Sequence, residues 1–299
     1  MGDMDKNCMY MKWFMGLERI PDTEGDRIRA YIRSEFRNEN ARISFFVLFK
    51  FSKLGRRCAS RGKHKKGTNG TVYSGHRLEI SEILNRPNEW LTNGALEIDY
   101  GIHLEAFHSD DGIWNFNFRD ELFNVRKDLT LKVLTQSETY NRELYCHKAQ
   151  LQFHSQFLTS KFSIDDPVFS NRVLPLNDDF RPDLTEIALQ IAHGVRPPLS
   201  IFGSCEVVKI AEKLKLRNVS RYCERQMIQC MDEWDYTYFF NEWDDDSFLK
   251  TAIKYDLNHL LAHMMTKNYS IEKICDRDIQ QMSRNTMMLI ISQFMETYL

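Results

Sequence analysis

The 299-residue sequence lacks any run of about 18 apolar residues, so it offers no candidate membrane-spanning helix. Its N-terminus also lacks the apolar core of a signal peptide. The formal net charge of -2 gives no global attraction to nucleic acid or to anionic lipid. The sequence therefore predicts a protein of the cytosol or the nucleus, with no membrane partner and no general affinity for nucleic acid.

Motifs of catalysis and metal binding are also missing. The seven cysteines are scattered without a Cys-x-x-Cys pair, which argues against both a disulfide framework and a zinc site. Glycine-rich phosphate-binding motifs and the His-Glu-x-x-His zinc motif do not occur. Cys146 and His147 are adjacent, and adjacent strand residues point to opposite faces, so they do not form a nucleophile–base pair. His259 and His263 lack a third ligand of clear spacing. We expect no enzyme activity, catalytic residue, metal or cofactor.

The N-terminal third of the chain is rich in short β-type segments. They contain β-branched or aromatic residues and are separated by turn signals; they cover residues 13–17, 28–32, 43–51, 71–73 and 95–104. Several short strands joined by turns predict an antiparallel β-sandwich.

A basic stretch, residues 53–66, is the one local charge anomaly in the sequence. Gly55, Gly62 and Gly67 punctuate it, and it contains no aromatic residue that could stack on a base. We interpret it as a solvated loop joining two strands. The alternatives are a nuclear-import signal or a loop that contacts phosphate.

The central part of the chain begins with a strand pattern at residues 128–133. Apolar residues alternate there with polar ones, which suits a strand with one buried face. Residues 144–162 start extended and turn helical, with a break near His154 and Ser155 that predicts two short helices. Residues 173–176 predict a further strand.

The following segments are predicted to be helical. Asp183 is the expected N-cap of a core helix, Glu186 completes a capping-box-like arrangement, and Gly194 marks the end. A repeat with a period of 41 residues then matches Ala211, Lys213, Leu216, Val219 and Cys223 with Ala252, Lys254, Leu257, Leu260 and Met264. The repeat predicts helix pairs that stack on one another.

Three separated motifs resemble the BTB (POZ) domain. They are Asp128-Leu-Thr-Leu, the pair His147-Lys148 entering a helix, and Ser155 to Phe162, and they occur in the family's order. The resemblance implies a protein-interaction module that forms dimers and is not an enzyme.

The β-rich segment resembles a MATH (meprin and TRAF homology) domain at Trp13, at the aromatic run 45–51 and at residues 90–98. Only about ten residues precede Trp13, whereas that family usually has two strands there. The resemblance implies an α+β protein with four parts: a shortened sandwich at 1–108, a linker at 109–117, a BTB domain at 118–228, and a helical, BACK-like extension at 229–299.

The combination of MATH and BTB implies an adaptor of a cullin-based ubiquitin ligase, in which MATH captures a substrate protein and BTB forms a homodimer and binds the cullin scaffold. The expected cullin-binding residues are Phe162, Ile164, Asp165 and Asp166, where aspartate replaces the glutamate of the family's apolar-x-Glu motif. If the loop aligns a few residues later, Pro167 and Val168 take that position and the motif is absent.

The expected dimer contact comes from an apolar stripe ahead of the BTB strand, formed by Phe118, Leu122 and Phe123. Asp128, at the start of that strand, is expected to belong to the same interface. The alternative is that the three apolar residues cover the core of their own domain. Two other functions stay open: a BTB oligomerisation scaffold or transcription co-factor without a ligase, and a degenerate family member whose shortened sandwich binds nothing.

Overall fold

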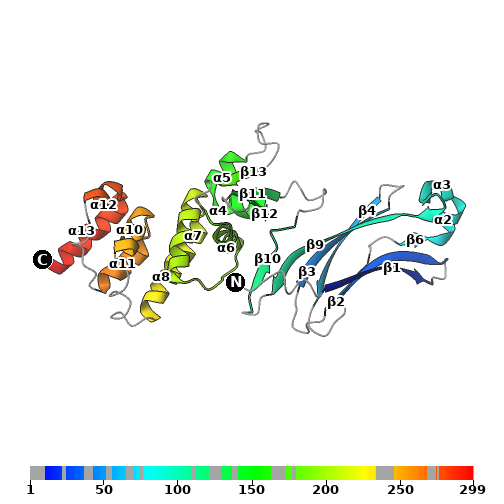
Figure 1. Cartoon of the computed structure of the whole chain (residues 1–299), viewed down its shortest axis with the longest axis horizontal. Coiled ribbons are helices and arrows are strands. Elements are labelled where there is room, and N and C mark those ends of the chain that lie inside the picture. Colours follow the sequence, from blue (N-terminus) through cyan, green and yellow to red (C-terminus); the bar gives the residue numbers. More distant parts are fainter. Residues whose placement is uncertain are drawn as a thin grey trace. The chain divides into compact units, whose positions relative to one another are not determined.

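The computed structural model describes residues 11–21, 25–36, 43–51, 56–64, 70–73, 77–108, 112–120, 130–136, 141–162, 173–176, 180–233, 246–267, 274 and 276–298. The chain is of mixed α and β structure (Figure 1) and divides into two compact units, Met1–Thr130 and Leu131–Leu299. Among the described residues, no helix combines the length and the apolar character needed to cross a bilayer.

The first sheet of unit 1 contains β1 (Met11–Ile20), β2 (Arg27–Phe36), β5 (Gly70–Tyr73) and β6 (Leu78–Glu79). β1 pairs antiparallel with β2, which also pairs with β5 and β6. Gly16 lies opposite Tyr31, and a Cβ atom at this glycine would come within 2.6 Å of the tyrosine ring. The strand therefore needs glycine at this position to let the aromatic ring approach.

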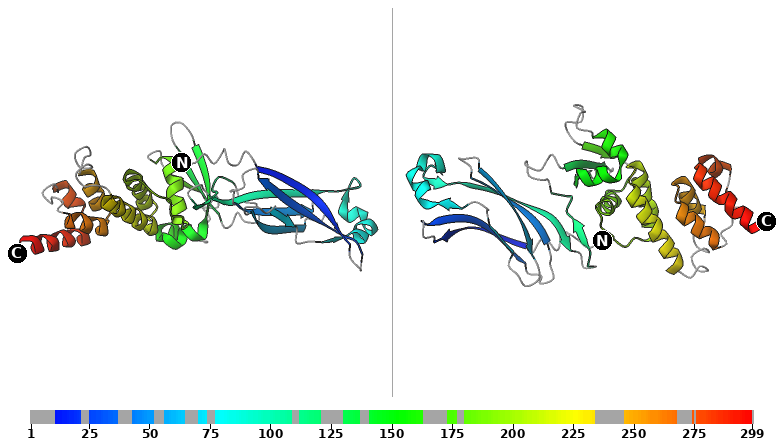
Figure 2. Two further views of the ribbon diagram at one scale, coloured as in Figure 1. Left: turned by 90° about the horizontal axis from the view of Figure 1, so that it is seen from below. Right: turned by 180° about the vertical axis from the view of Figure 1, so that it is seen from behind.

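The second sheet has the order β10-β9-β3-β4. Its strands are β3 (Ile43–Phe51), β4 (Arg56–His64), β9 (Ile98–His108) and β10 (Trp114–Phe116). β3 and β9 run side by side over most of their length, as Figure 2 also shows. β10 lies within the segment predicted as a linker, residues 109–117, and pairs with β9.

Apolar side chains of the two sheets form a shared core. Ala30 and Ile32 of β2 cluster with Phe45, Val47 and Phe49 of β3, and all five are almost fully buried. A second cluster joins this sandwich to α2 (Ile80–Asn85), α3 (Pro87–Trp90) and the hairpin of β7 (Leu91–Thr92) and β8 (Ala95–Leu96). The prediction of antiparallel strands packed as a sandwich is confirmed at this level.

The basic stretch is not a loop, and that prediction was wrong: Arg56–His64 is a full strand, β4, paired with β3. Its small residues Cys58, Ser60 and Gly62 take the register positions opposite the buried residues of β3. Small residues alternating with charged ones have the composition of a loop, which explains why propensity misled the prediction.

Unit 2 begins with a sheet of order β12-β11-β13. Its strands are β11 (Thr130–Gln136), β12 (Asn141–His147) and β13 (Val173–Leu176), the last parallel to β11. Leu131 and Val133 are buried, as the alternating pattern predicted. Two short helices follow β12, α4 (Lys148–His154) and α5 (Gln156–Lys161), and the predicted break between them is confirmed.

The core helix α6 (Pro182–Ala192) begins two residues earlier than predicted, with Arg181 rather than Asp183 as its N-cap. The proline ring presets the backbone of the first helical position, so it determines the start. Gly194 follows the helix with a φ of 96°, which confirms the predicted end.

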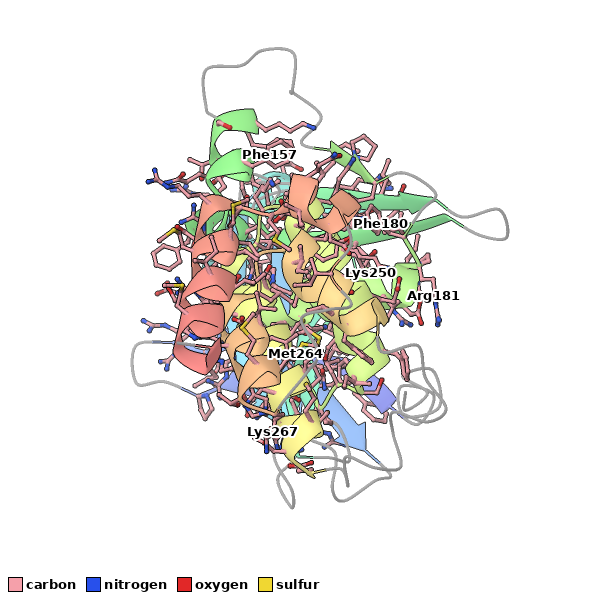
Figure 3. The ribbon with its side chains drawn as sticks, turned by 90° about the vertical axis from the view of Figure 1, so that its left-hand side faces the viewer. Phe157, Phe180, Arg181, Lys250, Met264 and Lys267 are labelled. Carbon is pink, nitrogen blue, oxygen red and sulfur yellow. The ribbon has the colours of Figure 1, made fainter. Side chains whose placement is uncertain are left out.

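The remaining helices are α7 (Ile201–Lys213), α8 (Arg217–Glu233), α10 (Asp246–Lys254), α11 (Asn258–Thr266), α12 (Asp276–Gln281) and α13 (Arg284–Tyr298). The repeat of 41 residues corresponds to two helix pairs, α7–α8 and α10–α11. Their matched apolar residues, such as Val219 and Leu260, are buried, and so is Met264, which Figure 3 labels. The predicted boundary at residue 228 falls inside α8.

Candidate interaction surfaces

Ser155 separates α4 from α5 and fixes the second helix. Its side-chain oxygen accepts a hydrogen bond from the Leu158 N–H at 3.1 Å, which caps α5. The same hydroxyl donates to the carbonyl of Leu214, at the end of α7, at 2.7 Å. Because Ser155 is buried, both bonds are shielded from water. Helix α5 is therefore held by one side chain to the first helix pair.

The outer face of α4 and α5 is exposed, and its exposed residues are uncharged, with the half-buried Lys161 beside them. Phe153 is 84% exposed and Phe157 is 39% exposed (Figure 3), while Lys161 places its ammonium 5.5 Å from the Phe157 ring centre. We call this face the α4–α5 surface; its exposed residues are Ala149, Gln150, Phe153, Gln156, Phe157, Thr159 and Ser160. An exposed face that centres on aromatic rings and whose exposed residues are uncharged has the composition of a protein interface.

Phe153 was not identified from the sequence, although a signal was present. Leu151 is the buried residue of α4, and Phe153 follows it by two positions, which places the two side chains about 200° apart around the helix. A short helix cannot bury both positions against one core. An apolar stripe indicates the buried face of a helix and gives no sign of an aromatic residue on the opposite face.

The predicted cullin-binding residues fall mostly outside the described part of the chain. Ile164, Asp165 and Asp166 are not described, and neither are Pro167 and Val168. Phe162 ends α5; its side chain is 2% exposed, and its carbonyl accepts a hydrogen bond from Gln152 Nε2 at 3.3 Å. Phe162 thus anchors the start of the predicted loop to the domain core.

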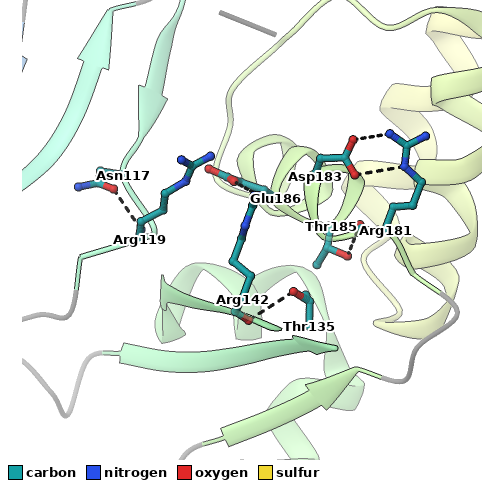
Figure 4. Close-up of polar contacts among 8 residues, drawn as sticks. All are labelled: Asn117, Arg119, Thr135, Arg142, Arg181, Asp183, Thr185 and Glu186. Carbon is teal, nitrogen blue, oxygen red and sulfur yellow. Dashed lines mark hydrogen bonds and ion pairs between the residues drawn. The ribbon is translucent and has the colours of Figure 1, made fainter. Parts of the chain in front are cut away.

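Of the four residues predicted at the dimer contact, only one is described by the structure. Leu122, Phe123 and Asp128 lie outside the described residues. Phe118 is described in unit 1, where it is 1% exposed and stacks on Phe116 with ring centres 5.9 Å apart. Next to it the Asn117 side chain accepts a hydrogen bond from the Arg119 N–H at 3.0 Å (Figure 4). A dimer contact through this segment stays a prediction.

The Cys146–His147 pair lies where β12 meets α4. Cys146 is fully buried, and burial, reinforced by the charge of Glu186, raises the pKa of its thiol well above the ordinary value. A thiol in this environment stays protonated, whereas a nucleophilic cysteine needs its thiolate. The geometry therefore gives Cys146 the role of a small apolar residue.

The backbone of His147 binds a buried histidine. Its N–H donates to Nε2 of His193 at 3.2 Å, and Nδ1 of His193 lies 2.7 Å from the carbonyl of Leu189. The neutral ring with its proton on Nδ1 satisfies both bonds. Burial lowers the pKa of His193 to about 4, although the bond to the Leu189 carbonyl opposes the shift.

An ion pair links β12 to α6. Arg142 Nη1 lies 3.1 Å from Glu186 Oε2, and the Thr135 hydroxyl donates to the Arg142 carbonyl at 3.3 Å (Figure 4). Glu186, predicted to complete a capping box, instead points its carboxylate at the strand. The contact secures the helix against the sheet that precedes the α4–α5 surface.

The described ranges contain no group of three or more histidine, cysteine, aspartate or glutamate residues that could hold a metal ion. Of the two histidines considered in the sequence, His263 places Nε2 3.1 Å from Asp232 Oδ1. Asp232 lies near the end of α8 and His263 in the last turn of α11, so this contact joins the ends of the two helices.

Two more exposed surfaces lie elsewhere. On β1, Met15 and Leu17 stand opposite the core residues Ile32 and Ala30 and so share the inner face of the sheet, yet they remain exposed. The last helix, α13, exposes four apolar residues: Met287, Met288, Ile291 and Met295.

Comparisons with protein-family models and with curated proteins find no match to this chain.

Proposed function

We propose that the protein is a dimeric interaction adaptor of the MATH–BTB type, serving as the substrate-recognition subunit of a cullin-based ubiquitin ligase. In this proposal unit 1 captures a segment of a substrate protein. Unit 2 forms the homodimer and binds the cullin scaffold. Both activities are protein binding, and no step requires a catalytic side chain, a metal or a cofactor.

The α4–α5 surface is the observation that carries the proposal. Exposing Phe153 and Phe157 to water is unfavourable, and covering an aromatic side chain yields about 1.5–3 kcal/mol. Its exposed residues are uncharged, and the neighbouring cation, Lys161, is half-buried against the Phe157 ring, so little electrostatic repulsion opposes the meeting of two copies. A second copy of the chain is thus a suitable partner for it.

The residues of the BTB resemblance also hold structural roles that suit the proposal. His147 ends β12 and Lys148 opens α4, while Ser155 caps α5 and binds Leu214. Phe162 then anchors the segment that the cullin contact requires. These roles support a BTB-like arrangement of unit 2.

Dimer formation is tested by placing charge on the α4–α5 surface. We expect the double variant Phe153→Glu/Phe157→Glu to sediment as a monomer at concentrations where the unmodified chain is a dimer. Leu84→Glu, which changes an exposed apolar residue of α2 in the same way, serves as the control and should leave the dimer intact. A variant that stays dimeric removes this surface from the proposal.

Cullin binding is tested by co-purification with the cullin scaffold. We expect the double variant Ile164→Ala/Asp166→Ala to lose the cullin, whereas Leu84→Ala/Glu89→Ala, a matched apolar and acidic pair in unit 1, retains it. Equal recovery with the first variant and the unmodified chain, or none with either, would remove the ligase role.

The second candidate is a BTB scaffold or transcription co-factor that works without a ligase. The α4–α5 surface supports it equally, since dimerisation serves both functions. A chain that forms the dimer but recovers no cullin, and that is held in the nucleus by residues 53–66, would favour this candidate.

A further inference from the structure

Helix α8 contains a row of three exposed arginines. Arg217, Arg221 and Arg225 follow one another at intervals of four residues, so they lie on one side of the helix, and all three are exposed. At a rise of 1.5 Å per residue, neighbouring members are about 6 Å apart along the helix axis. We call these three residues the arginine row.

The arginine row has no acidic partner within the described part of the chain, where none of its guanidinium groups forms an ion pair with a carboxylate. The nearest acidic residue in the sequence, Glu224, is buried and accepts two backbone N–H groups of α11. By contrast, two exposed lysines in and just after α7 are paired: Lys209 with Glu206 and Lys215 with Glu212. The charge of α8 is therefore left uncompensated where that of α7 is balanced.

The position of the arginine row is unfavourable for the helix itself. Like charges four residues apart repel one another, and cations near a helix N-terminus oppose the helix dipole. The first turn of α8 contains no acidic residue that would offset either effect. The stability of the fold therefore does not account for the row, whereas a binding role does.

A fourth arginine, Arg196, lies beside the row. It is exposed, follows α6 in the chain, and places its guanidinium carbon 5.2 Å from the centre of the Tyr222 ring of α8. Burial raises the pKa of Tyr222, and the charges of Arg196 and Arg225 oppose that shift, because both guanidinium groups lie near the ring. Arg225 also donates from Nε to the Arg221 carbonyl at 3.2 Å, so its side chain turns back along the row. The basic surface thus combines α8 with the segment after α6.

We propose that the arginine row binds a helical segment of a partner protein that has an acidic residue at every fourth position. Such a segment repeats its carboxylates at the same interval of about 6 Å, so an acidic side chain can face each arginine. The planar guanidinium groups suit bidentate contacts with carboxylates, which a lysine ammonium does not make. This surface goes beyond the dimer and cullin contacts of the proposed function, and none of its residues belongs to them.

An acidic protein segment fits the arginine row better than a nucleic acid does. α8 ends in Asp232 and Glu233, both exposed, so a phosphate backbone that continued along the helix would meet two acidic side chains. The one aromatic residue of α8, Tyr222, is buried and offers no ring on which a base could stack. The α8 helix of a second copy fits poorly as well, because it offers only these two exposed acidic residues, and Asp232 already pairs with Lys267 at 3.2 Å.

The test uses fluorescence anisotropy with the full chain and two labelled, alanine-based helical peptides. One peptide has a Glu at every fourth position, and the other has the same composition with its Glu residues distributed around the helix; the two are matched for helix content by circular dichroism. At low ionic strength we expect the first peptide to bind at least about tenfold more tightly than the second. The difference should disappear at high salt, which screens exposed ion pairs.

Protein variants complete the test. Arg217→Glu/Arg221→Glu should lose the patterned Glu peptide and gain a peptide with Lys at every fourth position, and this gain shows that the variant is folded. Lys250→Glu/Lys254→Glu is the matched control, because these two exposed lysines are also four residues apart on a helix, α10, and the change in net charge is the same. It should bind the Glu peptide as the unmodified chain does. If the first variant is unfolded by circular dichroism, Arg217→Gln/Arg221→Gln replaces it and should bind the Glu peptide about tenfold more weakly.

Three results would overturn the inference: equal binding of the two peptides at low ionic strength, equal loss in both charge-reversal variants, or tighter binding of a single-stranded RNA of matched charge. A change of oligomeric state in the arginine variant, without any change in peptide binding, would also overturn it and would assign the row to a contact between copies. The assay contains no cullin and does not use the α4–α5 surface. Its failure therefore leaves the cullin and dimer tests of the proposed function to stand or fall separately.

Discussion

Lys215 and Asp256, 41 residues apart, adopt the same left-handed backbone conformation, with φ of 52° and 56°. Each follows the first helix of a pair, and each is followed by a leucine whose N–H reaches back to an alanine carbonyl, at 2.8 Å from Leu216 and 2.9 Å from Leu257. These are Schellman turns. The repeat in the sequence is therefore a repeat of the turn as well as of the apolar face.

Replacing each residue with glycine should separate their roles. A non-glycine residue in this conformation costs roughly 1–2 kcal/mol of strain, which glycine avoids. Glycine also gives the unfolded chain more conformational entropy, and this offsets part of the gain. We expect Lys215→Gly to be neutral or to stabilise the protein by up to about 1 kcal/mol in urea unfolding.

Asp256→Gly should instead destabilise the protein, because the Asp256 carboxylate accepts hydrogen bonds from the hydroxyls of Ser283 at 2.5 Å and Thr286 at 2.6 Å. Burial opposes ionisation of Asp256, but the bonds from Ser283, Thr286 and Asn258 outweigh it and hold its pKa below the ordinary value. The buried Thr286 hydroxyl would lose its closer acceptor and keep only Asn258 Oδ1 at 3.2 Å, and with the lost bond from Ser283 the cost is about 1–3 kcal/mol. Equal effects of the two glycine variants would show that the carboxylate contributes nothing.

Glu224 is predicted to hold the two helix pairs together. This buried residue of α8 accepts the N–H groups of His259 at 2.8 Å and Leu260 at 3.1 Å, in the first turn of α11. The N-cap residue of α11, Leu257, makes no side-chain bond to this turn, so the carboxylate from α8 performs the capping.

We expect Glu224→Leu to lower the free energy of unfolding by about 2–4 kcal/mol, since it leaves two N–H groups without an acceptor. Glu224→Gln, which keeps an acceptor but loses the charge, should cost roughly half as much. Glu212→Gln affects an exposed ion pair with Lys215 and should cost less than about 0.5 kcal/mol. Hydrogen exchange should show faster opening of α11 in the leucine variant alone; unchanged exchange would contradict the capping role.

Ser155→Ala should weaken both the fold and the dimer. The change removes the cap of α5 and leaves the Leu214 carbonyl without its donor, for a combined cost of about 1–3 kcal/mol. Because α5 carries Phe157, the proposed dimer should also be weaker. In sedimentation experiments it should dissociate at a higher protein concentration than the unmodified chain does. Ser160→Ala is the matched control, because its exposed hydroxyl bonds only within its own helix, to the Phe157 carbonyl at 2.9 Å. Similar losses in both variants would argue against a special role for Ser155.

Much of the architecture was predictable because periodicity reflects burial. The alternation of Leu131 and Val133 located a strand, and the repeat that matches Val219 with Leu260 located the stacked helices. Strand β4 was not predicted, because small residues occupy the register positions opposite Phe45, Val47 and Phe49. Pairing with β3 forms that strand, and the composition of residues 56–64 does not indicate this partner.

The interaction surfaces were less predictable for a related reason. Phe162, which was expected to contact a cullin, is buried, whereas Phe153, for which no role was predicted, is exposed. Contacts between elements distant in the chain, such as Glu224 with α11, depend on three-dimensional placement. The sequence indicates that a residue is charged and does not indicate which helix end it reaches.

Stability should fall as the solution is acidified, with His193 as a principal cause. Burial lowers the folded pKa of His193 to about 4 from an ordinary 6.5, so the unfolded chain binds the proton more readily. The neutral ring contributes stability in full above the unfolded pKa. That contribution is lost as the pH falls through the interval from 6.5 to about 4, and the shift of roughly 2.5 units corresponds to about 3 kcal/mol.

The replacement His193→Gln separates this effect from other titrations. A glutamine amide can donate toward the Leu189 carbonyl and accept from the His147 N–H but does not titrate. We expect the variant to be less stable at pH 7 and to show a flatter profile in urea unfolding between pH 7 and 4. The charges of His147 and His154 also lower the pKa of His193. His154→Gln should therefore raise the folded pKa of His193, and the lower limit of the pH interval in which stability is lost should move slightly upward. Parallel profiles for His193→Gln and the unmodified chain would show that acid destabilisation originates elsewhere.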